Sequence, residues 1–195
     1  ISKFNHQNIS AKTLTDYWHL ANTFYCGPKI RGININIRPA QIETEILALM
    51  QEVQTLRPRR VLEIGTATGG TLYLWTKLAS QDATIISLDL PQGRFGGGYL
   101  SARQKLMESF PSSEQTLKLI RANSHDSSTK QEILRQLNGQ LLDFLFIDGD
   151  HSYSGVKADW EDYSPLVRPG GLIALHDIAH NPLETASQVD RFWLE

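Results

Sequence analysis

From residue 59 onward the sequence alternates short apolar segments with longer amphipathic ones, and this alternation constrains the fold more than any other feature. Five apolar segments have the length and composition of buried strands, at residues 59–65, 83–90, 116–122, 141–148 and 170–177. Helical patterns lie between them, at residues 69–80, 98–110, 128–138 and 154–167. Strands joined by helices of this length favour right-handed crossovers and a mostly parallel sheet. The sequence therefore predicts a doubly wound α/β fold with helices on both faces of the sheet.

Helices are also expected outside this alternating region. Apolar residues at helical spacing run through residues 40–56 and stop before Pro58, and a weaker helical pattern covers residues 11–22. A final helix is expected to begin near Leu183 and to continue to Glu195. We therefore expect residues 1–40 to form a helical and loop extension, and residues 41–195 to form the main domain.

The composition argues against several classes of partner. Hydrophobic residues make up 41% of the chain, which is typical of a globular protein. The 19 basic and 21 acidic side chains give a net charge of −2, so nothing favours nucleic acid or a membrane surface as a partner. No apolar run approaches the roughly 20 residues that span a bilayer. The single cysteine, Cys26, cannot form an internal disulfide, which fits a reducing compartment and a cytoplasmic location.

Polar residues follow every predicted strand. In a parallel sheet these residues emerge at one edge, where ligands bind near the switch in strand order. Surface loops are polar as well, but the concentration of acids and histidines favours a ligand or metal site over a solvated edge. The residues are Gly65-Thr66, Asp89, Asn123-Ser124, Asp148-Gly149-Asp150-His151 and His176-Asp177.

The stretch "VLEIGTATGG" at residues 61–70 is the first chemical motif. Gly65 allows a sharp turn out of the strand, and Gly69-Gly70 allow the next helix to begin with its backbone exposed to a ligand. The acid after the next strand, Asp89, would then bind the ribose hydroxyls of a nicotinamide or an adenosyl cofactor. A glycine turn that only packs the strand against the helix is the structural alternative.

Glu63 adds to this motif, because an unpaired charge within a buried strand is costly and needs a donor. The amino group of a methionine moiety or a backbone amide would serve. The stretch "EIGTATG" resembles the first motif of class I S-adenosylmethionine-dependent methyltransferases, acid-x-Gly-x-x-x-Gly, at Glu63, Gly65 and Gly69. Ala67 stands where that family commonly has a middle glycine. The resemblance implies a Rossmann-like fold and S-adenosylmethionine as the cofactor of residues 41–195.

A second resemblance covers residues 141–178, "LLDFLFIDGDHSYSGVKADWEDYSPLVRPGGLIALHDI". This stretch is similar to metal-dependent O-methyltransferases, and most of all to the branch that contains macrocin O-methyltransferase and the cephalosporin hydroxylase-like proteins. The segment "GININIRPAQI" at residues 32–42 resembles that branch too, so the similarity extends over about residues 30–180. It implies methylation of a hydroxyl group on a small molecule.

The resemblance also implies roles for individual residues. Asp148, His176 and Asp177 would bind a divalent cation such as magnesium or manganese, although the relatives usually have an acid where His176 stands. His151 would be the base that accepts the substrate proton. Asp150 would contact the cofactor or support His151. The full set of expected cofactor contacts is Glu63, Gly65, Thr66, Gly69, Gly70, Asp89, Asn123, Ser124, Asp148 and Asp150.

Other functions remain open at this point. An NAD(P)-binding oxidoreductase would explain Gly65, Gly70 and Asp89, but it would leave Glu63 and residues 148–151 without a role. A metallohydrolase would need ligands after the first strand, where "GTATGG" offers none. A non-catalytic cofactor-binding module is the third alternative. Class I methyltransferase sheets also usually have two more strands than this sequence contains, so the chain is truncated or its sheet differs there, and a homo-oligomer could cover the edge.

Overall fold

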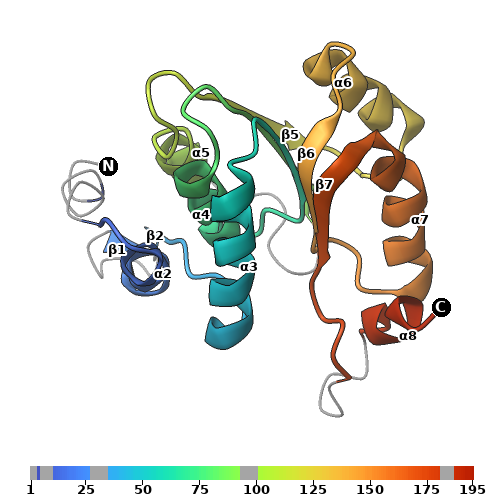
Figure 1. The fold of residues 1–195 in the computed structure, drawn as a ribbon, viewed down its shortest axis with the longest axis horizontal. Coiled ribbons are helices and arrows are strands. Elements are labelled where there is room, and N and C mark those ends of the chain that lie inside the picture. The colour runs from blue at the N-terminus through green and yellow to red at the C-terminus, as the bar shows by residue number, and fades with distance from the viewer. Residues whose placement is uncertain (1–3, 5–10, 27–34, 93–100, 181–186) are drawn as a thin grey trace.

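The computed structural model describes residues 4, 11–26, 35–92, 101–180 and 187–195, and its centre is a parallel sheet (Figure 1). The strands are β3 (Arg60–Ile64), β4 (Thr84–Asp89), β5 (Thr116–Arg121), β6 (Leu142–Ile147) and β7 (Val167–Leu175). They are ordered β5-β4-β3-β6-β7, and every neighbouring pair is parallel. The strand order reverses between β3 and β6, so the ligand-binding edge of the sheet lies beyond the carboxyl ends of these two strands.

Helices cover both faces of the sheet, which confirms the doubly wound prediction (Figure 1). One face carries α3 (Glu43–Leu56), α4 (Gly70–Leu78) and α5 (Ser101–Met107), and the other carries α6 (Ser127–Leu137) and α7 (Tyr153–Tyr163). Alternate strand residues enter two different cores, since Val61 packs with Trp75 on the first face and Leu62 packs with Ile133 on the second. No helix among the described residues has both the length and the apolar character to cross a membrane.

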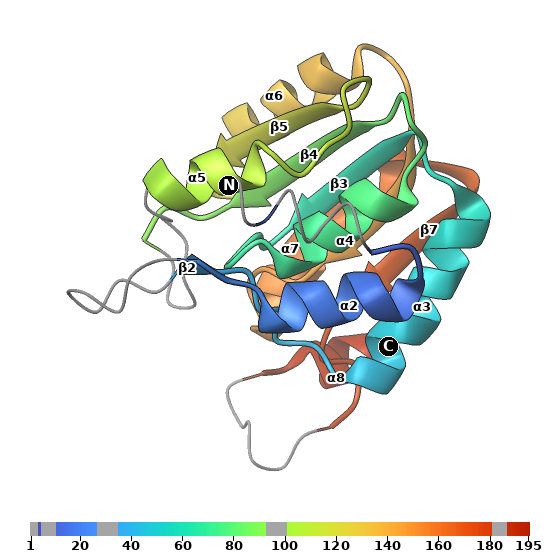
Figure 2. The ribbon, with the colours of Figure 1, turned by 90° about the vertical axis from the view of Figure 1, so that its left-hand side faces the viewer.

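The N-terminal extension is helical, as expected, and it shares the core of the first face. Helix α2 (Leu14–Thr23) begins with a capping box in which Thr13 and Asp16 bond reciprocally. Trp18 and Ile37 belong to the same buried cluster as Trp75, and Figure 2 shows α2 lying across the layer of α3 and α4. Two short antiparallel strands, β1 (Tyr25–Cys26) and β2 (Ile35–Asn36), follow α2.

Two expectations about the last third of the chain need correction. The fifth strand, expected at residues 170–177, begins three residues earlier as β7 and includes "RPGG"; Arg168 Nε donates to Asp143 Oδ1 at 2.6 Å, and the register against β6 shifts between Leu142 and Phe144. The final helix, expected from Leu183 to Glu195, is only α8 (Val189–Trp193); residues 187–188 are not helical, and Leu183 lies outside the described residues. Among the described residues no strand follows β7, so β7 is an edge of the sheet.

A buried hydrogen-bond chain fixes the end of β3 and the loop that follows it. Glu63 is fully buried; Trp75 Nε1 donates to its Oε1 at 3.1 Å, and Ser87 Oγ donates to its Oε2 at 2.7 Å. Thr66 Oγ1 lies 2.5 Å from the same Ser87 hydroxyl. The donors of Glu63 are therefore side chains of α4 and β4, and neither a backbone amide nor a ligand is needed to pair it.

Gly65 offers a first test, because its φ is +100° and a Cβ there would lie 2.0 Å from the backbone oxygen of Asp148. We expect Gly65→Ala to lower the free energy of unfolding by more than about 3 kcal/mol, since β3 and β6 must separate. Gly139→Ala is the matched control, because φ is +75° there and an added Cβ would have no described atom within 4 Å. This substitution should lower the free energy of unfolding by only about 1 kcal/mol, the cost of a left-handed backbone at alanine. If urea unfolding shows that both variants lose the same free energy of unfolding, the close approach of β3 and β6 at Gly65 is unimportant for stability.

Glu63 generates a pH-dependent prediction. Burial raises its pKa from 4.5 to about 7, although hydrogen bonds from Thr71 and Ser87 act in the opposite direction. Because the folded state holds this proton more tightly than the unfolded state, stability should fall as the pH rises from 4.5 to about 7. Glu63→Gln removes this dependence, so its free energy of unfolding should rise relative to wild type by about 2–3 kcal/mol across that interval. The exposed substitution Glu114→Gln should follow the wild-type curve; parallel curves for all three proteins would contradict the prediction.

Candidate functional site

The carboxyl ends of β3, β6 and β7 open onto one cavity of about 570 Å³. The loop after β3 forms one wall, and the residues after β6 and β7 form another. A third wall comes from the segment before α3. The lining residues include Arg38, Gln41, Ile42, Gly65, Thr66, Gly70, Asp148, His151, His176 and Asp177. The structure thus brings together residues that follow β3, β6 and β7, as the edge argument predicted, and adds the segment before α3, which that argument did not include.

The loop after β3, which we call the glycine loop (residues 65–69), presents the start of α4 to this cavity. Gly65, Ala67 and Gly69 all have positive φ, at 100°, 44° and 90°. Gly69 is the N-cap of α4 and supplies no side-chain hydrogen bond, so the first amides of the helix remain available to an anion. Ala67, at the position of the expected middle glycine, adopts the conformation that a glycine would favour.

The segment before α3 (residues 37–42) packs against the glycine loop and the first residue of α4. A Cβ on Gly70 would lie 2.2 Å from the backbone oxygen of Ile37, so only glycine fits beneath this segment. Thr68 Oγ1 also donates to the backbone oxygen of Arg38 at 2.7 Å. The N-terminal extension therefore forms a wall of the site as well as part of the core.

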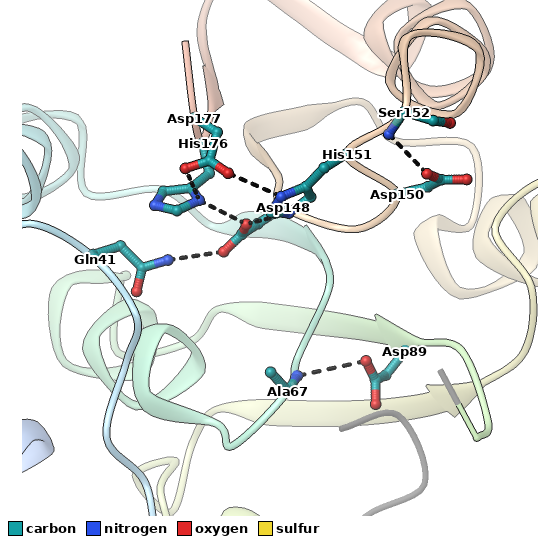
Figure 3. Close-up of polar contacts among 9 residues, drawn as sticks. All are labelled: Gln41, Ala67, Asp89, Asp148, Asp150, His151, Ser152, His176 and Asp177. Atoms are coloured by element: carbon teal, nitrogen blue, oxygen red, sulfur yellow. Dashed lines mark hydrogen bonds and ion pairs between the residues drawn. The ribbon is translucent and has the colours of Figure 1, made fainter. Parts of the chain in front are cut away.

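Two acids and two histidines, which we call the acid–histidine cluster (Asp148, His151, His176 and Asp177), meet on the opposite wall (Figure 3). His151 lies between the two acids: its Nε2 is 3.2 Å from Asp148 Oδ1 and its Nδ1 is 2.9 Å from Asp177 Oδ2. His176 Nδ1 is 3.1 Å from Asp148 Oδ1 and 3.1 Å from Asp177 Oδ1. Asp177 takes a left-handed backbone conformation, with φ 59°, which aspartate tolerates better than most residues other than glycine.

The charges within this cluster are strongly coupled. The neighbouring carboxylates, Asp148 first and then Asp177, raise the pKa of His151 to about 10. Burial acts to lower the pKa of His176, but the same two acids raise it above its ordinary value. Burial acts to raise the pKa of Asp148, but its close contacts with the imidazoles of His151 and His176 hold it below its ordinary value. The cluster therefore favours positive charge between its two carboxylates.

The donor atoms of this cluster suit a divalent cation. Asp148, His151 and His176 each offer one ligand atom, and these atoms all lie within 4.8 Å of one another. His176 Nδ1 is buried and makes no hydrogen bond of acceptable geometry with the described residues, so this nitrogen remains available as a ligand. One carboxylate oxygen with two imidazole nitrogens would favour manganese or another transition ion over calcium. His151, expected from the sequence as a base, thus lies close enough to be a ligand too.

The other expected cofactor residues lie around the same edge, but they do not line the cavity formed by the described residues. Asp89 accepts a hydrogen bond from the Ala67 amide at 3.5 Å, which ties the end of β4 to the glycine loop (Figure 3). Asn123 Oδ1 accepts from the His125 amide, and the Ser124 carbonyl accepts from Tyr163. Their contact with a cofactor, like that of the buried Glu63, stays a prediction.

Asp150 points away from the acid–histidine cluster (Figure 3). Its Oδ1 accepts a hydrogen bond from the Ser152 amide at 2.9 Å, just before α7 begins. The support for His151 comes instead from Asp148, Asp177 and a backbone bond that the Gln188 amide donates to the His151 carbonyl at 2.8 Å. A cofactor contact by Asp150 stays a prediction.

Gln41 is a site residue that the sequence did not single out. Its Nε2 donates to Asp148 Oδ2 at 2.8 Å, although the two residues are 107 positions apart. Gln41 lies within the segment "GININIRPAQI", but no sequence pattern assigned this residue a role, so only the fold could reveal its contact with Asp148.

Comparisons with known proteins agree with this geometry. The profile of a family described as a methyltransferase domain matches residues 62–178. An uncharacterised protein from Sinorhizobium fredii is 28% identical over 130 residues, which cover 64% of this chain and 14% of that protein. The chain therefore spans a small part of this curated relative.

Solved structures share the fold. The MycE methyltransferase of the mycinamycin biosynthetic pathway, in complex with Mg and SAH, matches with a TM-score of 0.50 and 24% identity over 67% of this chain and 33% of that one. An O-methyltransferase from Bacillus cereus in complex with SAH matches with a TM-score of 0.56 and 19% identity, over 80% of this chain and 70% of that one. The O-methyltransferase TomG from Streptomyces achromogenes, in complex with SAM, matches with a TM-score of 0.54 and 16% identity, over 96% of this chain and 80% of that one.

The profile match covers more than half of the chain, including both the glycine loop and the acid–histidine cluster. At these identities the structural matches show the fold alone, and the fold is the one expected from the sequence. The chain belongs to the methyltransferase domain family and has the class I methyltransferase fold.

Proposed function

We propose that this chain is an S-adenosylmethionine-dependent methyltransferase that methylates a hydroxyl group of a small molecule with the help of a divalent cation. The observation that carries the proposal is the single cavity into which the glycine loop and the acid–histidine cluster both open. A methyl donor on one wall and a cation-bound hydroxyl on the other would face each other across a short gap. Family membership and relatives solved with SAH or SAM support the same function.

The cofactor is proposed to lie along the glycine loop. The uncapped start of α4 would receive the methionine carboxylate, because free helix amides and the helix dipole favour an anion. Asp89 at the end of β4 would accept hydrogen bonds from the ribose hydroxyls. Glu63 would act indirectly, since its carboxylate holds Ser87, which in turn bonds to Thr66 of the loop.

The cation is proposed to bind Asp148, His176 and Asp177. When bound, such a cation lowers the pKa of a coordinated hydroxyl and fixes its orientation. MycE, one of the proteins with this fold, was solved with Mg. Engaging the two carboxylates would also remove the interactions that raise the pKa of His151, which would leave this imidazole able to accept a proton. His151 is therefore the proposed base.

The acceptor is proposed to enter between the segment before α3 and the segment after β7. Ile42 and Ile178 line this entrance, and they are 59% and 40% exposed. Exposed apolar residues beside a polar floor suit an acceptor with an apolar body and a hydroxyl group at the buried end. Cofactor, cation and acceptor would then meet at the carboxyl ends of β3 and β6.

The cofactor assignment predicts that S-adenosylhomocysteine raises the melting temperature and that NAD does not. Asp89→Ala should weaken S-adenosylhomocysteine binding about tenfold or more, because charge-assisted bonds to the ribose are lost. Asp82→Ala is the matched control, since this acid lies before the opposite end of β4 and pairs with Arg59 at the surface. Calorimetric titration gives both affinities; binding of NAD instead, or equal affinities in the two variants, would contradict the assignment.

The cation assignment predicts that chelation stops methyl transfer but leaves S-adenosylhomocysteine binding nearly intact, because the cofactor lies mainly on the glycine loop. Activity should return on adding manganese or magnesium, measured by transfer of a radiolabelled methyl group to a panel of small hydroxylated acceptors. His151→Ala should lower turnover far more than manganese affinity if the residue is a base. An equal loss of both would make His151 a ligand, and full activity after exhaustive chelation would eliminate the cation.

A further inference from the structure

We propose that Gln41 is a positioning residue for Asp148, which turns one oxygen of this carboxylate toward the cation site. The proposal rests on the proposed function, because it concerns how the same site holds its cation. The observation behind the proposal is that one Asp148 oxygen contacts Gln41 and the other contacts the two imidazoles.

The two carboxylate oxygens of Asp148 have different partners among the described residues. Gln41 Nε2 donates to Asp148 Oδ2 at 2.8 Å, whereas Oδ1 lies 3.2 Å from His151 Nε2 and 3.1 Å from His176 Nδ1 (Figure 3). A carboxylate without such a bond can rotate and present either oxygen, or both. With Oδ2 held by an amide, Asp148 offers one oxygen, in one direction, to a cation beside the two histidines.

Gln41 comes from a part of the chain that is fixed to the opposite wall of the cavity. Thr68 of the glycine loop donates to the carbonyl of Arg38, and Pro39 packs against Gly70 so closely that a Cβ there would lie 2.6 Å from the Pro39 nitrogen. Helix α3 begins two residues after Gln41, at Glu43. The Gln41 amide therefore links the segment that contacts the glycine loop to Asp148 of the acid–histidine cluster.

The other polar atom of the Gln41 side chain also belongs to the site. Its Oε1 is buried and has no hydrogen-bond partner among the described residues. Because Gln41 lines the cavity, a water molecule or a bound ligand can donate a hydrogen bond to this oxygen there.

The experiment compares Gln41→Met with wild type and with Gln104→Met. Methionine keeps the unbranched shape and removes the donor. Gln104 is the matched control because it is also half-buried and its Nε2 donates to the Glu108 carboxylate at 2.9 Å, but on α5 away from the cluster. Manganese affinity is measured by electron paramagnetic resonance on the full chain, S-adenosylhomocysteine affinity by calorimetry without metal, and folding by the melting temperature.

We expect Gln41→Met to weaken manganese binding on the order of tenfold, while the melting temperature and the S-adenosylhomocysteine affinity stay close to those of Gln104→Met. An unchanged manganese affinity overturns the proposal, and so does a parallel loss of manganese affinity, cofactor affinity and melting temperature, which would mark a structural role. Wild-type protein that binds S-adenosylhomocysteine but no manganese contradicts this inference and the cation assignment, and leaves the cofactor assignment standing.

Discussion

The close contact between Gly65 and Asp148 sets the geometry of the whole site. β3 and β6 are neighbours at the point where the strand order reverses, and the missing side chain of Gly65 lets the glycine loop turn directly over the backbone of Asp148. Any Cβ at this position would overlap the Asp148 carbonyl, at 2.0 Å. This contact brings a loop suited to an anionic cofactor next to a cluster suited to a cation. The glycine loop is also held by the hydrogen bonds that link Glu63, Ser87 and Thr66, and by the bond from Thr68 to the Arg38 carbonyl.

Electrostatics explain why such a cluster can exist inside a folded protein. Two carboxylates that share a half-buried position repel each other, and the folded chain places an imidazole between them. The acids raise the pKa of His151 to about 10, which favours a positive charge on this ring; in the proposed enzyme a cation would provide the charge. Because either source satisfies the acids, the fold tolerates the site before the cation arrives. Gln41 adds direction to this charge balance by occupying the one Asp148 oxygen that the imidazoles do not face.

Much of this arrangement follows from sequence patterns of short range. Apolar strands alternating with helices predicted the sheet, and the rule for carboxyl ends predicted that Asp148, His151, His176 and Asp177 would meet. The patterns failed where long-range contacts decide the outcome. β7 begins at Val167 rather than at residue 170, beside the ion pair of Arg168 with Asp143, and the donors that Glu63 has in the structure, Trp75 and Ser87, were not indicated by the sequence. The segment of Gln41 could be recognised from the sequence, but the role of the residue could not, because its contact is with an acid 107 residues away.

The central claim is that one edge of the sheet holds the methyl donor and the cation together. Paramagnetic relaxation tests it most directly, with manganese bound to the protein and S-adenosylmethionine labelled with carbon-13 in its methyl group. The account predicts strong relaxation of the methyl signal, which chelation reverses and which Asp148→Ala abolishes without releasing the cofactor. A bound cofactor whose methyl signal is unaffected by bound manganese would place the two ligands apart and would contradict the account.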